Sequence, residues 1–444
     1  MYSFLRWVFG FTGMFLFFSC GFSSKIQREV KKSLLADSLL SGAYVGISVF
    51  DPERNHFVYQ YQPDKYFVPA SNVKIVSLYA GLKYLGDSLI GLKYKDKNDT
   101  LFIEPAGDPS FLHPDFSDHP VLHFLERSEK PIAITTDNWN SNAWGKGWMW
   151  DDYNDAFMAE RSPFPMYGNV ISWNQVRDSS SIGALAREEA FIYSVPDINW
   201  KVHFSEDTAA RRFSAVRSLT GNRFFITQGR EINARQEVPF ITQGLRSTVE
   251  LLRDLVKAPI DTTDRMVQSE SVIYSQPTDT LLKNMMYRSD NFYAEQLLLM
   301  AAYQRFGVMD DQRLIQYLLK NDLQEFPQKP RWVDGSGLSR YNLFTPEDMV
   351  WILRKMEKDF GAERLKHIFP AGGQGTLHDS FREFQDRIYA KSGSMSGVFC
   401  LSGYLQSQSG KRLIFSLMIN NYTQGGRLLR RKVASFLHQV VSKY

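Results

Sequence analysis

A serine and a lysine three positions apart, Ser71 and Lys74, stand at the start of a strongly apolar segment. A serine hydroxyl becomes a good nucleophile only when a neighbouring base removes its proton. Residues three apart lie on one face of a helix, so the Lys74 amine can reach the Ser71 oxygen. Burial or a nearby cation would lower the pKa of this lysine and let it act as the base. Since about one or two Ser-x-x-Lys matches are expected by chance in such a chain, this pair needs the support of further motifs.

The second motif is Ser289-Asp290-Asn291, which lies between two helical runs at 280–288 and 292–306. A serine at such a junction could pass a proton to a leaving group, and Asn291 could hold an amide of the substrate. Ser172-Trp173-Asn174 shares the Ser-x-Asn pattern but falls in a turn-like stretch, where a structural asparagine is expected.

The third motif, Lys391-Ser392-Gly393, ends one strand-like run and precedes another. A cation and a hydroxyl beside a glycine suit recognition of a carboxylate on an extended peptide that docks on a sheet edge. Gly393 would permit a close backbone approach. The three motifs together match the active-serine triplet Ser-x-x-Lys, Ser-Asp-Asn and Lys-(Ser/Thr)-Gly, in the required order.

With these motifs the chain resembles the class C low-molecular-mass penicillin-binding proteins, the D-alanyl-D-alanine carboxypeptidase/endopeptidase group. The resemblance runs from about residue 30 to the end. It departs from the usual pattern at Ser392, where the family generally has threonine, but the hydroxyl is kept. Besides the triplet, it includes Gly107-Asp108-Pro109, Asp334-Gly-Ser-Gly-Leu-Ser-Arg340 with Asn342, Gly375-Thr376-Leu377 and Lys391-Ser-Gly-Ser-Met-Ser-Gly397.

The elements that must position these motifs come from both ends of the chain. A helix is expected at 71–85 and a last helix at 427–441, with strands at 44–50, 57–61, 387–390, 398–405 and 412–419. The simplest arrangement of these elements is an α+β fold with one antiparallel sheet and helices on both of its faces. The resemblance implies the same five-stranded sheet of a penicillin-binding/β-lactamase-like transpeptidase domain.

The domain organisation follows from a change in composition along the chain. We expect a discontinuous serine peptidase domain at 26–94 and 263–444. The stretch between them, 95–262, is rich in short β runs, turns and aromatic residues, and is expected to form one or two small inserted domains. The long separation of the first two motifs is typical of the resembled family rather than of a β-lactamase.

The resemblance also implies a mechanism and a substrate. Ser71 would attack the carbonyl between the two terminal D-alanines of a peptidoglycan stem peptide, and Lys74 would take its proton. Water would then release the acyl-enzyme without a metal or organic cofactor, and β-lactams would acylate the same serine. The N–H groups of Ser71 and Ser394 would form the oxyanion hole, and Ser289 would relay a proton. Asn291 would bind the substrate backbone, and Lys391, Ser392 and Gly393 would bind its carboxylate. Asp137 would recognise the diamino acid of the stem peptide.

The N-terminus predicts export. Residues 1–20 hold Arg6 followed by an apolar run, too short to span roughly 30 Å of hydrocarbon but suited to a secretory signal peptide. The run ends at Ser19-Cys20, which resembles a lipoprotein signal, so Cys20 would be lipidated and anchored to a membrane. A plain cleaved signal or an uncleaved anchor are the alternatives. Each places the protein in the cell envelope outside the cytoplasm, in the periplasm.

Composition excludes several other classes of protein. The chain has 444 residues, 43% of them hydrophobic, which rules out a mainly disordered protein. A net charge of +4 argues against a nucleic-acid binder. Two cysteines cannot form a disulfide framework, and Cys400 is expected in the core. The basic group Arg427, Arg430, Arg431 and Lys432 is expected to be a solvated helix face.

Competing functions remain open at this point. A metal hydrolase could be drawn from His113, Asp115, His119 and His123, but no glutamate completes a zincin motif. No Gly-x-Ser-x-Gly elbow is present, which disfavours an α/β-hydrolase. The more serious rival is a catalytically silent protein that binds cell-wall peptides or acts as a scaffold.

Overall fold

The computed structural model describes residues 34–135, 137–177, 190–205, 210–265, 270–423 and 425–443. The expected signal peptide and Cys20 lie outside these ranges. The chain divides into two compact units, the first from 1–79, 282–289 and 319–444 and the second from 80–281 and 290–318. The expected insertion at 95–262 falls wholly within the second unit, and its boundaries stay a prediction.

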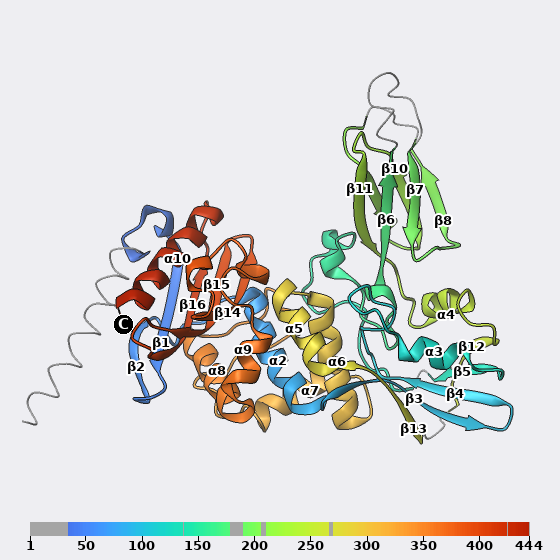
Figure 1. Ribbon diagram of the computed structural model, residues 1–444, viewed down its shortest axis with the longest axis horizontal. Helices are drawn as coiled ribbons and strands as arrows, with labels where there is room; N and C mark the ends of the chain where they lie inside the picture. Colours follow the sequence, from blue (N-terminus) through green and yellow to red (C-terminus); the bar gives the residue numbers. More distant parts are fainter. Residues whose placement is uncertain are drawn as a thin grey trace, which may run out of the picture. The chain divides into compact units, whose positions relative to one another are not determined.

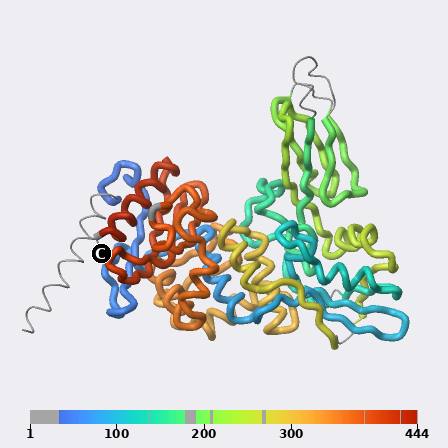
Figure 2. Tube along the Cα trace, in the orientation of Figure 1, coloured from blue at the N-terminus to red at the C-terminus, as the bar shows by residue number. Residues whose placement is uncertain are grey.

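The first unit is built on a five-stranded antiparallel sheet with the order β14-β15-β16-β1-β2. The expected sheet is thereby confirmed, with each strand within a few residues of its expected place. Because β1 pairs with β16, the beginning and the end of the chain lie side by side in its centre (Figures 1 and 2). The strands are β1 (Tyr44–Asp51), β2 (His56–Tyr61), β14 (Ile388–Met395), β15 (Val398–Gln406) and β16 (Arg412–Asn420).

Helices cover both faces of this sheet because successive side chains of each strand point to opposite sides. On one face, Phe399 and Leu401 of β15 pack in a core with Val433 of α10 (Gly426–Lys443). The other face lies against α8 (Pro346–Phe360), whose Leu353 carbonyl accepts a 2.9 Å hydrogen bond from the Tyr404 hydroxyl. Helices on both faces, as expected, follow from this two-sided burial.

Helix α2 (Val73–Tyr84), which begins in the first unit and continues into the second from Ala80, is buried on nearly every side, as its apolar composition predicts. Its residues Val73, Ile75, Val76 and Leu78 have no exposed surface. The remaining helical elements of this unit are η2 (Ser38–Leu40), η3 (Ala70–Asn72), α9 (Ala362–Ile368), η8 (Gly375–Leu377) and η9 (Arg382–Phe384), together with the C-terminal part of α5 (Thr278–Arg288).

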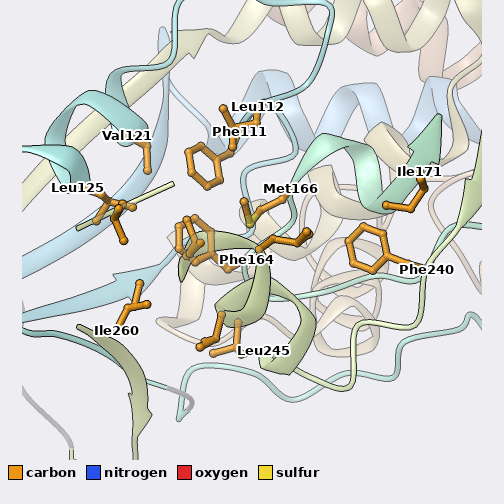
Figure 3. Packing of buried hydrophobic residues seen from close by; sticks show 14 of the residues in the cluster. Phe111, Leu112, Val121, Leu125, Phe164, Met166, Ile171, Phe240, Leu245 and Ile260 are labelled. Carbon is orange, nitrogen blue, oxygen red and sulfur yellow. The ribbon is translucent and has the colours of Figure 1, made fainter. Parts of the chain in front are cut away.

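Among its described residues, the second unit holds three sheets, with the orders β12-β5-β4-β3-β13, β11-β6-β7 and β8-β10-β9. One continuous apolar core lies among them, and Figure 3 shows part of it around Phe164, whose ring stacks on Phe111 at 5.1 Å between centroids. The strands are β3 (Ser88–Lys97), β4 (Thr100–Pro105), β5 (Ile132–Thr135), β6 (Val170–Val176), β7 (Phe191–Val195), β8 (Lys201–Phe204), β9 (Ser214–Arg217), β10 (Arg223–Thr227), β11 (Asn233–Pro239), β12 (Ile260–Thr263) and β13 (Ser271–Pro277).

Two further helices of the second unit matter for the site. Helix α6 (Asn291–Phe306) begins at the last residue of the Ser-Asp-Asn motif, with Asp290 as its N-cap, and α7 (Asp311–Lys320) follows it. The unit also contains α3 (Pro120–Glu126), α4 (Arg246–Arg253), η4 (Trp150–Asp152), η5 (Ala156–Met158) and η6 (Tyr167–Asn169). Within the described ranges, no helix is both long and apolar enough to span a bilayer.

Candidate active site

Ser71 lies in the short helix η3, at the point where the chain turns into α2. The Nζ atom of Lys74 donates a hydrogen bond of 3.0 Å to Ser71 Oγ, and Lys74 is fully buried. Asn72 fixes this turn to the sheet, because its Nδ2 donates a 2.7 Å bond to Ser402 Oγ of β15. The expected serine–lysine pair is therefore formed at the start of a rigid, buried helix.

A loop at 334–340 contacts this turn closely. The Ser336 carbonyl accepts a 2.7 Å hydrogen bond from Lys74 Nζ, so the lysine is held between a hydroxyl and a carbonyl. A Cβ atom added to Gly337, whose φ is +82°, would lie 1.9 Å from the Ala70 carbonyl oxygen. Only glycine fits such an approach.

The shape of this loop depends on Asp334, which is fully buried. Its carboxylate accepts hydrogen bonds from the N–H groups of Gly337 (2.9 Å) and Ser339 (2.7 Å) and from Asn342 Nδ2 (2.7 Å). Sequence reasoning noted this segment only as part of the resemblance and missed its contact with Lys74. The available signal was an aspartate followed by two glycines in alternate positions, which predicts a tight turn.

Strand β14 supplies the second lysine. Lys391 is fully buried, and its Nζ donates to Ser289 Oγ at 2.8 Å and to the Ser392 carbonyl at 2.7 Å. Burial and then repulsion from Lys74 lower the pKa of Lys391 well below its usual value. Two lysines thus face one another in a buried site, each bonded to a serine hydroxyl.

Gly393, two residues further along β14, faces the nucleophile turn. A Cβ atom there would lie 2.8 Å from the Pro69 carbonyl oxygen and 2.9 Å from the Ser71 backbone nitrogen. The strand can approach Ser71 this closely only without a side chain.

Ser289 connects α5 to the N-cap of α6 with a left-handed backbone, at φ +62°. This conformation is uncommon outside glycine and asparagine, and such residues are concentrated at functional sites. Both Ser289 and Ser71 line a cavity of about 340 Å³ in the first unit. Its other lining residues are Thr376, Leu377, Ser380, Phe381, Ser392, Ser394, Phe399, Leu401, Arg430 and Val433.

Arg430 corrects one sequence-based expectation. The basic group of α10 was expected to be only a solvated face, but Arg430 lines this cavity and its Nη2 donates a 3.1 Å hydrogen bond to Ser394 Oγ. No spacing in the sequence links Arg430 to the triplet, because the link depends on how α10 packs against the sheet.

Two predicted site residues lie in the second unit. Asn291 is the first residue of α6, and its Nδ2 donates a 3.0 Å hydrogen bond to the Phe157 carbonyl. Asp137 lies toward the opposite end of that helix, because the neighbouring Asn138 carbonyl accepts from the backbone N–H of Met309, which follows the helix C-terminus. At 1.5 Å per residue, a helix of 16 residues separates these ends by about 24 Å. The structure does not bring Asp137 to Asn291.

The histidine and aspartate side chains considered as metal ligands form hydrogen bonds with other residues of the chain. The Tyr293 hydroxyl contacts His113 Nδ1 and Asp115, each at 2.8 Å, and His119 Nδ1 accepts from the Leu112 N–H. In the part of the chain that the structure describes, no group of three or more His, Cys, Asp or Glu side chains could hold a metal ion.

Comparisons with known proteins agree with this geometry. A crystal structure of penicillin-binding protein 4 from Haemophilus influenzae superposes with a TM-score of 0.72 and 20% identity, covering 91% of this chain and 98% of that one. A second structure of that protein, complexed with a β-lactam, gives 0.68 and 18% over 95% and 99% of the two chains. The chain therefore has the penicillin-binding-protein fold.

The sequence comparisons carry the assignment further. The model of the D-Ala-D-Ala carboxypeptidase 3 (S13) family matches residues 27–440, and the chain belongs to this family. A relative, the D-alanyl-D-alanine carboxypeptidase DacB of Haemophilus influenzae, is 24% identical over 93% of this chain and 92% of its own length. The resemblance inferred from the motifs is confirmed.

Proposed function

We propose that this protein is a serine-type D-alanyl-D-alanine carboxypeptidase/endopeptidase that cleaves peptidoglycan stem peptides or their cross-links through an acyl-enzyme on Ser71. The single observation that carries the proposal is the hydrogen bond between Lys74 and Ser71, in a cavity that Ser289 also lines. Family membership and the D-Ala-D-Ala carboxypeptidase relative supply the substrate class.

Acylation uses the two serine–lysine contacts in turn. Ser71 Oγ attacks the carbonyl carbon of the scissile amide while its proton passes to the neutral amine of Lys74, 3.0 Å away. The backbone N–H groups of Ser71 and Ser394 stabilise the resulting oxyanion. As the C–N bond breaks, Ser289 gives its hydroxyl proton to the departing amine. The lysine pair, which has gained the Ser71 proton, gives one proton to Ser289 through the hydrogen bond from Lys391, so the pair again holds a single proton.

The paired lysines explain why a base is available at neutral pH. Two buried ammonium groups repel each other, and the repulsion acts on both. The pair therefore favours a state with a single proton, in which one amine is neutral. The Ser336 carbonyl keeps the Lys74 amine directed at the nucleophile. Water then attacks the ester carbonyl with the same lysine as base and releases Ser71.

Substrate binding is assigned to β14 and to the start of α6. Ser392 and Gly393 hold the end of the peptide that carries the carboxylate, with Lys391 beneath them, and Asn291 holds a backbone amide. We leave Asp137 out of the site because of its place near the other end of α6. β-Lactams enter the same cavity and acylate Ser71.

An envelope enzyme must leave the cytoplasm, and the N-terminal apolar segment supports export as a signal peptide. Lipid attachment at Cys20 belongs to the same proposal, as do a peptidase domain at 26–94 and 263–444 and an inserted region at 95–262. Intact mass with and without treatment by lipoprotein signal peptidase in membranes would test the lipid anchor.

The deciding experiment is intact-mass measurement of the protein after incubation with benzylpenicillin, beside Ser71→Ala. We expect one covalent adduct per wild-type chain and none on the variant. Ser396→Ala, a change at an exposed serine of the adjoining turn, is the matched control and should be acylated like the wild type. A folded wild-type protein that forms no adduct would favour the silent peptide-binding protein instead.

A further inference from the structure

The cavity beside Ser71 has one charged residue among the lining residues described, and it is Arg430 of α10. The Arg430 side chain is exposed, and its Nη2 donates a 3.1 Å hydrogen bond to Ser394 Oγ on the strand that would hold the peptide. A guanidinium has five N–H donors, so this contact leaves donors for a ligand.

Lys391 is not placed to bind a carboxylate that enters this cavity. Its ammonium group is fully buried, does not line the cavity, and directs hydrogen bonds to Ser289 Oγ and to the Ser392 carbonyl. A carboxylate that enters the cavity therefore meets the Ser392 and Ser394 hydroxyls and the Arg430 guanidinium.

We propose that Arg430 binds the α-carboxylate of the residue that leaves when the acyl-enzyme forms, and so selects substrates with a free carboxylate next to the scissile amide. A planar guanidinium pairs with a carboxylate through two parallel hydrogen bonds, which fix its orientation as well as its charge. The inference rests on the proposed function and adds a residue outside the three motifs.

The apolar residues that line the same cavity suit the rest of such a leaving residue. Phe399, Leu401 and Val433 are apolar residues that line the cavity together with Ser392 and Ser394. A small apolar side chain can contact these residues while its carboxylate binds Arg430. The leaving residue would thus be recognised at two points, its carboxylate by charge and its side chain by apolar contact.

The test compares two synthetic peptides that end in D-Ala-D-Ala, one with a free C-terminal carboxylate and one with a carboxamide. For the carboxylate peptide we expect Arg430→Ala to lower kcat/KM by about 10- to 100-fold, mainly through KM, because a charge-assisted hydrogen-bonded pair is lost. The carboxamide peptide should be cleaved slowly and equally by both proteins. Arg430→Lys should recover part of the loss, because the charge returns without the planar fork.

Arg431→Ala is the matched control, since it removes the same charge from the next, exposed position of α10. Equal kinetics of the Arg430 and Arg431 variants on both peptides would overturn the proposal and leave the peptidase function standing. An equal loss on both peptides would also overturn it, because that result means a structural role. A wild-type chain that neither cleaves a peptide nor reacts with benzylpenicillin would overturn the peptidase function and this proposal together.

Discussion

Lys391 Nζ lies 2.8 Å from Ser289 Oγ and donates a hydrogen bond to it, across a sequence separation of 102 residues. Since the lysine supplies the proton of this bond, the hydroxyl proton of Ser289 is free to point toward the cavity. The contact thus prepares Ser289 to donate to a departing amine.

We therefore expect Ser289→Ala to slow acylation by about 10²-fold or more, the usual loss when a positioned proton donor is removed. Stopped-flow acylation with a chromogenic β-lactam measures the rate directly. Ser380→Ala, at another serine that lines the cavity, should keep a near wild-type rate. Equal rates for the two variants would remove Ser289 from the mechanism.

The paired lysines predict a pH effect with a definite sign. Acylation requires a neutral Lys74, so the rate should rise as pH rises through the pKa of the pair. Lys391→Met removes the neighbouring positive charge, and the remaining lysine then holds its proton to a higher pH. The acidic limb of the pH–rate profile should move to higher pH, whatever the change in its maximum.

The profile of Lys83→Met, a change at an exposed lysine of the same helix as Lys74, should keep the position of its acidic limb. A limb that stays in place in the Lys391 variant would contradict the coupling of the two lysines.

Gly337 and Gly361 allow backbone strain to be separated from close packing. Both have φ +82°, but a Cβ atom at Gly361 meets no atom within 4 Å, whereas one at Gly337 lies 1.9 Å from the Ala70 carbonyl oxygen. Gly361→Ala should cost about 1–3 kcal/mol of unfolding free energy from backbone strain alone, because φ +82° with ψ +146° is a conformation that residues other than glycine rarely adopt. Gly337→Ala should cost more and should also reduce acylation, because the nucleophile turn must move. Similar stability and acylation in the two variants would contradict the packing argument.

Asp348 predicts a pH dependence of stability. Desolvation by burial raises the pKa of this carboxyl to about 6, above its ordinary 3.8. The folded protein then binds the proton more tightly than the unfolded chain, so this contribution is greatest below pH 4 and is lost as pH rises to 6. The total loss is at most about 3 kcal/mol.

Urea unfolding of the wild type and of Asp348→Asn from pH 4 to 7 measures this contribution to the free energy of unfolding. The stability of the wild type relative to the variant should fall over this range, although the variant also loses an acceptor at the start of α8. A constant difference for Asp348→Asn would contradict the raised pKa.

The sequence predicted those parts of the fold and site that depend on local pattern. Ser71 and Lys74 meet because three residues make nearly one helical turn, and alternating apolar residues located the strands of the five-stranded sheet. The Ser336 carbonyl could not be predicted, because it is a backbone atom brought to Lys74 from 262 residues away. Arg430 was misjudged for a related reason: an exposed arginine on an amphipathic helix looks solvated until the helix is packed. Asp137 shares a turn-like setting with many structural aspartates, and the course of α6 alone shows its distance from Asn291.

The pairing of β1 with β16 also governs when the catalytic sheet can be completed during folding. The backbone N–H of Val68 donates a 2.7 Å bond to Asn420, 352 residues further along the chain. Closing so long a loop is slow, and the central strand pair cannot form before the last part of the chain is available. The sheets of the second unit use only strands between β3 and β13, so we expect them to acquire protection in pulse-labelling hydrogen exchange before β1 does. The active site around Ser71 can therefore form only after the C-terminal strand β16 has joined the sheet.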